Sequence, residues 1–389
     1  MSAILRARAS VPPVVRRLAV LSFWNDTASE LAYPLIPLFL TRTLGAPVAV
    51  VGLIEGLAES LATGLRGPAG AWSDRHGRRP LIVAGYGIAA IAKPLVAIAM
   101  AWPLVLVLRM ADRTGKGIRT APRDALISDA TTPETRGAAF GYHRSLDTLG
   151  AVLGPLVALG LLTLGVPIRW VLAVAIVPGL VTLYALRALK EPPRTTVAGP
   201  VKLPWRERLS VFDRRLVLIT LGVALFSLGN SSDAFLILRA SDLGLSTALC
   251  VLAYAAYNVV SAAIAWPAGV LSDRIGRRAL LSGGMLAFAA VYLGFAAMGS
   301  SWQVWPLFLA YGVAVALTDG IAKALVADAA PRAHVGAVLG VFTAVAGLCA
   351  LVASLGAGIL WDVAGPGTVF ALGAACALAG SIVIAGAGR

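Results

Sequence analysis

A stripe of charged side chains runs along segment 103–129, which is otherwise apolar. On a helix that turns 100° per residue, these charges fall within an arc of about 120°. They are Arg109, Asp112, Arg113, Lys116, Arg119 and Arg123. A charge that faces lipid at the bilayer centre costs about 2.5–3.5 kcal/mol, so we expect this face to meet other helices or water. For Arg119 and Arg123, reaching the cytoplasmic interface is an equally good interpretation.

Acidic residues also recur one helical turn apart on segments 17–41 and 47–72. Asp26 and Glu30 are four residues apart, as are Glu55 and Glu59, so each pair points from one face of a helix. A carboxyl group in apolar surroundings can titrate near neutral pH, as a proton carrier must. We predict four proton-coupling residues: Asp26, Glu30, Glu59 and Asp112. The alternative is a set of static ion pairs that hold helices together.

Other polar residues within apolar segments are expected to line a substrate cavity. The expected lining is Asn25, Glu55, Arg109, Arg113, Lys116, Arg144, Asp147, Asn230, Asp233, Tyr254, Tyr257, Asn258, Asp319 and Lys323. The lining residues from the first half of the chain are mostly charged, and those from the second half are mostly neutral. This asymmetry indicates proton handling in the first half and neutral substrate contacts in the second. A charged substrate that binds the first half directly is the alternative.

The composition requires a membrane around these charges. Of the 389 residues 58% are hydrophobic and 13% charged, and the mean hydropathy is +0.83, so a soluble domain could not bury the apolar surface. We expect twelve helical spans of about 20 residues or more. They are 17–41, 47–72, 80–101, 103–129, 137–164, 168–188, 214–240, 246–272, 279–299, 302–328, 335–361 and 366–387. The predicted fold class is all-α integral membrane with twelve transmembrane helices, because the runs lack the alternation of barrel strands.

The net charge of +14 follows membrane topology and does not require a nucleic-acid partner. Basic residues gather before the first span, after the second and eighth, and between the sixth and seventh, which places both termini in the cytoplasm. The three cysteines lie inside expected spans, with no disulfide or metal-ligand spacing. No phosphate-binding loop or metal cluster is found, so we expect no cofactor and no metal.

The chain contains an internal duplication. The string Gly70–Arg79 returns as Gly269–Arg278, 199 residues later, and the same offset aligns Asp129 with Asp328. We predict an N-terminal six-helix bundle over 1–188, a cytoplasmic linker over 189–213 and a C-terminal six-helix bundle over 214–389.

The duplicated string has the composition of a tight turn between two helices. Gly70 and Gly77 allow close approach and reversal of the chain. Asp74 could cap a helix N-terminus, and Arg75 or Arg78 could pair with an acid at the end of the fourth span, such as Asp129.

This string resembles the signature turn of the major facilitator superfamily, Gly-x-Leu-x-Asp-Arg-x-Gly-Arg-Arg/Lys. Trp72 replaces the leucine in the first copy, and Leu271 retains it in the second. In that family such turns join the bundles in one conformation, so the resemblance implies a conformational latch. Its residues would be Gly70, Asp74, Arg75, Gly77, Arg78, Asp129, Gly269, Asp273, Arg274, Gly276, Arg277 and Asp328.

A second motif on the fifth span resembles the helix 5 motif of antiporters in the same family. It consists of Gly141, Gly150, Gly154 and Pro155. The usual closing glycine pair is absent, because Ala158 and Leu159 stand there. We expect these residues to bend the helix and to remove side-chain bulk where it meets a neighbour.

The resemblance implies a secondary transporter working by alternating access, with no enzymatic activity. Its fold would be that of the superfamily, in a bacterial inner membrane and as a monomer. Proton-coupled efflux of a small organic molecule is the favoured function, and proton-coupled uptake of a small charged solute is the alternative. A membrane enzyme that uses the acids of the first two spans would need a histidine or metal, for which His143 is the one candidate.

Overall fold

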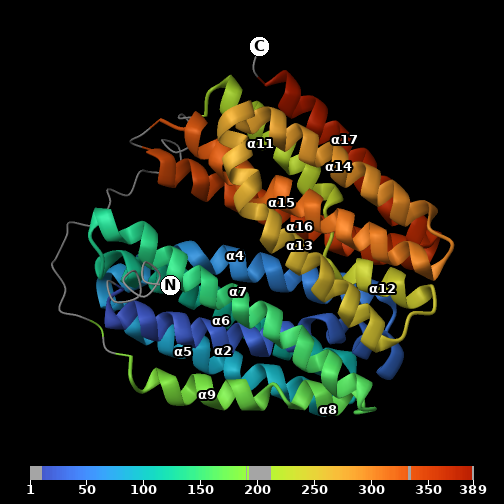
Figure 1. The fold of residues 1–389 in the computed structure, drawn as a ribbon, viewed down its shortest axis with the longest axis horizontal. Coiled ribbons are helices and arrows are strands. Elements are labelled where there is room, and N and C mark those ends of the chain that lie inside the picture. Colours follow the sequence, from blue (N-terminus) through green and yellow to red (C-terminus); the bar gives the residue numbers. More distant parts are fainter. Residues whose placement is uncertain (1–10, 190, 192–211, 332–333, 388–389) are drawn as a thin grey trace. The chain divides into compact units, whose positions relative to one another are not determined.

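The computed structural model describes residues 11–189, 191, 212–331 and 334–387, and the regular elements in these ranges are helices (Figure 1). The expected linker lies mostly outside the described residues. The first half begins with an irregular helix made of α2 (Pro13–Ala32), η1 (Tyr33–Leu35), α3 (Ile36–Leu38) and η2 (Phe39–Thr43). It continues with α4 (Val48–His76), α5 (Arg78–Leu95), η3 (Val96–Ile98), α6 (Trp102–Asp129), α7 (Pro133–Thr163), α8 (Ile168–Ala173) and α9 (Ile176–Leu186).

The second half begins with a helix in two pieces, α11 (Arg214–Gly229) and α12 (Ala234–Asp242). It continues with α13 (Thr247–Ile275), α14 (Arg277–Ala297), η4 (Ser301–Gln303), α15 (Val304–Ala329), α16 (Val335–Ala364) and α17 (Pro366–Gly386). Joining the short elements to their neighbours gives twelve long helices over the described residues, as the sequence predicts.

Ten of these helices are long and apolar enough to cross a membrane by length and composition alone. The other two are the first and the fourth, in which charged residues interrupt the apolar sequence. Large apolar side chains remain exposed on helices throughout the described chain, for example Ile98, Val107, Trp170, Trp266 and Ile382. Exposure of this kind is expected of surfaces that contact lipid.

The duplication is retained in the register of the helices. Both α4 and α13 have 29 residues, and their first residues, Val48 and Thr247, are 199 positions apart. The first helix of each half is irregular at the corresponding place. Pro34 and Pro37 lie where α2 gives way to η1 and α3, because proline cannot continue the hydrogen-bond ladder, and residues 230–233 separate α11 from α12.

The described chain forms two compact units. One contains the described residues 11–39, 61–189 and 191, and the other contains the described residues 40–60, 212–331 and 334–387. The start of α4 therefore belongs to the second unit, although the sequence places it in the first bundle. Backbone N–H groups of Val48 and Ala49 donate to Asp362 at 3.1 and 2.8 Å, and the Ser60 hydroxyl donates to the Gly347 carbonyl at 3.2 Å.

Within the first unit, the helix 5 glycines lie where α7 packs against α2. A Cβ atom at Gly154 would be 2.6 Å from the Thr27 carbonyl oxygen, and one at Gly150 would collide with the Phe23 carbonyl oxygen. Gly141 has open space around it, and Pro155 lies within the continuous helix α7. Gly150 and Gly154 thus allow the two helices to approach backbone to backbone.

This contact predicts a position-specific effect of adding one methyl group. Gly154→Ala should lower the free energy of unfolding by about 1–3 kcal/mol, because the methyl group has no space against α2. Gly160→Ala, on the same helix with open space around it, should cause no loss of stability. Thermal unfolding of both purified variants in detergent measures the difference. Equal stability of the two variants would contradict the close approach.

Candidate functional site

The charged centre of the first unit is built around Asp112 on α6. Its carboxylate lies 3.0 Å from the Lys93 ammonium, 3.6 Å from the Arg109 guanidinium and 3.9 Å from that of Arg113. Asp112, Lys93 and Arg109 are each at most 5% exposed. One buried carboxylate is therefore shared among three cations. We call these four residues the Asp112 cluster.

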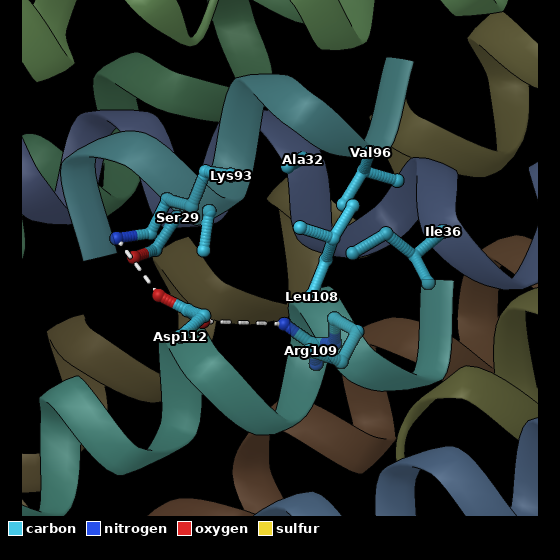
Figure 2. A pocket seen from close by; sticks show the side chains of 9 residues that line it. Ser29, Ala32, Ile36, Lys93, Val96, Leu108, Arg109 and Asp112 are labelled. Atoms are coloured by element: carbon cyan, nitrogen blue, oxygen red, sulfur yellow. Dashed lines mark ion pairs between the residues drawn. The ribbon is translucent and has the colours of Figure 1, made fainter. Parts of the chain in front are cut away.

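A small pocket opens beside the Asp112 cluster, between the first, third and fourth helices. Figure 2 shows the charged ends of Lys93 and Asp112 with Ser29 at one side and aliphatic side chains at the other. Arg109 lies along the pocket below them (Figure 2). The lining residues are Ser29, Ala32, Ile36, Ala92, Lys93, Val96, Leu108, Arg109 and Asp112.

Lys93 was not among the residues predicted from the sequence. It is the one charged residue of segment 80–101, so an isolated charge in an apolar run was the available signal. A charged side chain that faces lipid is costly, and this argument, which identified the stripe on the fourth span, applies equally to Lys93. Its partner could not be read from the sequence, because α5 and α6 meet only through the fold.

An amide connects Lys93 to the acids of the first helix. Lys93 Nζ donates to Asn25 Oδ1 at 2.9 Å, and Asn25 Nδ2 donates to Asp26 Oδ1 at 3.0 Å. Asp26 is in side-chain hydrogen-bond contact with Asp147 of α7, which also accepts from Arg144 at 3.1 Å. Asn25, Asp26, Asp147 and Arg144, all predicted from the sequence, thus form one chain of contacts with the Asp112 cluster.

The two arginines near the end of the stripe lie against polar and aromatic partners of the same unit. Arg119 is 5% exposed, and its guanidinium lies 4.7 Å from the centre of the Tyr86 ring. Arg123 donates to the Ser22 hydroxyl at 3.4 Å. Ser22 also lies 2.8 Å from the hydroxyl of Tyr86 and from Nε2 of His143. Arg119 is therefore enclosed by other parts of the first unit.

The second unit has its own half-buried acid at the break between α11 and α12. Asp233 accepts hydrogen bonds from the hydroxyls of Tyr257 and Tyr311, the latter at 2.6 Å. Glu55, 7% exposed, lies near enough to Asp233 for the two charges to interact. The sequence predicted Asp233, Tyr257 and Glu55 as lining, whereas Tyr311 was missed because a single tyrosine in an apolar helix gives no signal.

The other predicted lining residues of the second half surround this acid less closely, although Asp319 is near enough to Asp233 for the two charges to interact. Asp319 and Lys323 are 3.9 Å apart with mostly exposed side chains. The Tyr254 ring packs edge-on against Tyr257 with 5.2 Å between centroids, and Asn258 donates to the Tyr254 carbonyl at 3.0 Å. Asn230 ends α11 at the helix break.

The remaining predicted acids and Lys116 are partly buried. Glu30 is one turn beyond Asp26 on α2, beside Gly154, and Glu59 lies on α4. Lys116 lies one turn beyond Asp112 on α6 and is close enough to Asp26 for their charges to interact. Over the described residues, no three His, Cys, Asp or Glu side chains come together as metal ligands.

The duplicated turns form the same ion-pair triad in each unit. Arg78 pairs with Asp74 and, at 3.3 Å, with Asp129. Arg277, 199 residues later, pairs with Asp273 at 3.3 Å and with Asp328 at 2.7 Å. Gly77 and Gly276 have φ of +111° and +93°, a conformation that glycine adopts without strain. The side chains of Arg75 and Arg274 are exposed.

The expected cap by Asp74 is wrong. Asp74 pairs with the Arg78 side chain, whereas the N–H groups of Arg78 and Arg79 at the start of α5 both donate at 3.0 Å to Glu191. A carboxylate at a helix N-terminus is favoured by the helix dipole and the N–H groups. Glu191 follows the sixth span, so its role could not be inferred from the local sequence.

The family follows from comparison of this chain with known proteins. The model of the major facilitator superfamily matches residues 18–261 and again residues 221–387. The chain belongs to the major facilitator superfamily. It is therefore a multi-pass membrane protein and a secondary transporter of a small molecule, and not an enzyme.

Relatives of the chain include an uncharacterised MFS-type transporter of Methanocaldococcus jannaschii, 35% identical over 375 residues, or 94% of this chain and 93% of the relative. The multidrug resistance protein MdtH of Salmonella newport is 27% identical over 348 residues, or 89% and 84% of the two chains. Among solved structures, a bacterial homologue of the human lysosomal transporter Spinster superposes with a TM-score of 0.73 at 18% identity, covering 96% of this chain and 94% of the other. That structure shares the fold.

The shared carboxylate predicts unequal effects of removing its partners. Asp112→Asn should lower the free energy of unfolding by about 3–5 kcal/mol, because the buried Lys93 and Arg109 and the partly buried Arg113 then surround a neutral amide. Lys93→Met should cost less, because Asp112 keeps Arg109 and Arg113. The double variant should cost less than the two losses combined.

Thermal unfolding of the purified variants, followed by tryptophan fluorescence, measures these differences. Asp319→Asn makes the same chemical change at an exposed ion pair and should have little effect. Additive losses for Lys93→Met and Asp112→Asn would contradict a direct interaction between the two side chains.

Proposed function

We propose that this transporter couples the movement of a small organic molecule to protons, with Asp26 and Asp147 as the proton-carrying pair. It would work by alternating access, as a monomer in a bacterial inner membrane with both termini in the cytoplasm. The observation that carries the proposal is the contact between these two carboxyl groups.

Two carboxylates in contact cannot both be ionised at low cost. An ionised carboxylate only accepts hydrogen bonds, so a hydrogen bond between two carboxyl groups requires one proton. The negative charge of one carboxylate opposes ionisation of the other when the two are in contact, most strongly away from water. Losing that proton changes the charge of the pair within a membrane helix bundle, which gives a transporter a means of responding to pH.

Asp112 is a weaker candidate for this task than the pair. Three cations within 4 Å stabilise its charged form, so it suits the role of a permanent counter-ion. Asn25 places Lys93 and Asp26 at the two ends of one amide, which supports the idea that occupancy of the pocket and protonation of the pair influence each other.

Export in exchange for protons is the first candidate for direction. It is supported by the similarity to MdtH, whose name assigns it to multidrug resistance, and by the helix 5 glycines. Proton-coupled uptake is the second candidate, because a pocket with cations beside a protonatable pair favours entry of an anion together with a proton.

Everted membrane vesicles test the proton coupling and its direction. Respiration acidifies their interior, so an exporter should concentrate its substrate from a mixture of organic acids, amines and neutral metabolites, measured by mass spectrometry. Asp147→Asn should abolish accumulation, because an amide cannot exchange the proton. Asp213→Asn is the matched control, since asparagine caps α11 as well as aspartate.

A protonophore should have the same effect as Asp147→Asn. Accumulation only in right-side-out vesicles would favour uptake over export. Accumulation in either orientation that survives both Asp147→Asn and the protonophore would reject proton coupling.

We further propose that the two ion-pair triads of the duplicated turns act as a conformational latch. Each joins the end of one transmembrane helix to the start of the next and to the end of the fourth helix of its unit. A contact that stabilises one state of the transporter affects rates of reorientation more than folding.

If the triads act as a latch, a variant that breaks one of them should insert into the membrane normally but transport slowly. Asp74→Ala should give normal amounts of membrane-inserted protein but slow or absent transport, because Arg78 loses one of its two carboxylates. Asp74→Glu, which keeps the charge, should retain part of the rate. Initial transport rates in the vesicles, normalised to protein amount, are the measurement. An unchanged rate in Asp74→Ala would reject the latch.

A further inference from the structure

The pocket beside the Asp112 cluster has two chemically different sides. Its charged side presents the Lys93 ammonium and the Arg109 guanidinium, together with one carboxylate from Asp112 (Figure 2). Its other side is aliphatic and consists of Ala32, Ile36, Ala92, Val96 and Leu108. The cavity of about 10 Å³ has room for one water molecule, so a ligand with an anionic head and a short apolar substituent enters it only when side chains such as Asp112 move aside.

We propose that this pocket binds the carboxylate group of the substrate, so that the transported molecule is an organic acid with an apolar substituent. The inference rests on the proposed transport function and names its substrate class. Two cations and one carboxylate line the pocket, so its charged side attracts an anion and repels an ammonium group.

The Asp112 side chain indicates that the cations of the pocket are positioned to bind a carboxylate. Lys93 and Arg109 already meet a carboxylate there, at 3.0 and 3.6 Å. A planar guanidinium and an ammonium suit carboxylate oxygens well. A ligand carboxylate can therefore replace Asp112 at these two cations without a new kind of contact.

Asp112 does not lose all its charge partners in this exchange. Arg113, which does not line the pocket, lies 3.9 Å from the Asp112 carboxylate and remains available to it. The Ser29 side chain lies at the charged side with Lys93 (Figure 2), where its hydroxyl donates to the Asn25 carbonyl at 3.0 Å and leaves the two cations to hold the ligand head. The internal carboxylate thus acts as a competitor that the substrate displaces.

The test uses the purified full-length protein in detergent with three probes of one size: butyrate, butyramide and butylammonium. Sodium chloride keeps the ionic strength equal, and the shift of the thermal unfolding midpoint with probe concentration reports binding. Butyrate should raise the midpoint, while butyramide and butylammonium should not. Equal responses to all three probes, or a response to butylammonium alone, would overturn the proposal.

Three variants locate the binding. Lys93→Met should weaken the apparent butyrate affinity about tenfold or more, since a charge-assisted hydrogen bond is lost. Arg215→Met removes one positive charge from an exposed position on α11 and should leave the affinity unchanged. Asp112→Asn should strengthen binding, because the internal competitor is neutralised; a purely structural role of the cluster would weaken it instead. Unchanged affinity in Lys93→Met also overturns the proposal.

The binding assay and the vesicle assay fail independently. Proton-driven accumulation with no response to butyrate would reject the carboxylate pocket and retain the proposed function. Butyrate binding that depends on Lys93, without proton-driven movement of any solute, would reject the coupling and retain the pocket.

Discussion

Charges can be buried inside a membrane protein only where opposite charges meet them, and Asp112 meets this requirement for the first unit. Its single carboxylate is shared by Lys93, Arg109 and Arg113. Because each charge would cost several kcal/mol in lipid, the third and fourth helices must keep these side chains facing each other. The pocket, its polarity and the connection to the first helix all depend on that constraint.

The sequence predicted the helices well because a bilayer imposes their length and hydropathy. The first and fourth helices were also predicted, although their charged residues make them less apolar than the other ten helices. The duplicated turn led us to expect that Arg78 could pair with Asp129, and the structure has this ion pair at 3.3 Å. Other contacts between segments far apart in the sequence could not be predicted. Those of Lys93 with Asp112, Asp26 with Asp147 and Glu191 with the start of α5 depend on helix rotations and positions that no periodicity specifies.

The duplication preserved the turns but changed the interior. Positions 199 residues after Lys93, Arg109 and Asp112 are Tyr292, Phe308 and Tyr311. The charged cluster of the first unit therefore corresponds to an aromatic one in the second, where Tyr292 and Tyr311 rings lie 6.3 Å apart and Tyr311 bonds to Asp233. Equivalent positions therefore make ionic contacts in the first half and aromatic contacts in the second. The two halves share a fold but differ in the side chains of their interiors.

Asn25 is a directional connector, since its carbonyl end faces the Lys93 ammonium and its amino end faces the Asp26 carboxyl. Turning the amide over would set a donor against an ammonium group and an acceptor against a carboxylate oxygen, so the orientation is unique. Thermodynamic linkage then makes the effect mutual. Any solute that draws Lys93 away from Asn25 alters the proton affinity of Asp26 by the same factor by which that proton alters the affinity for the solute.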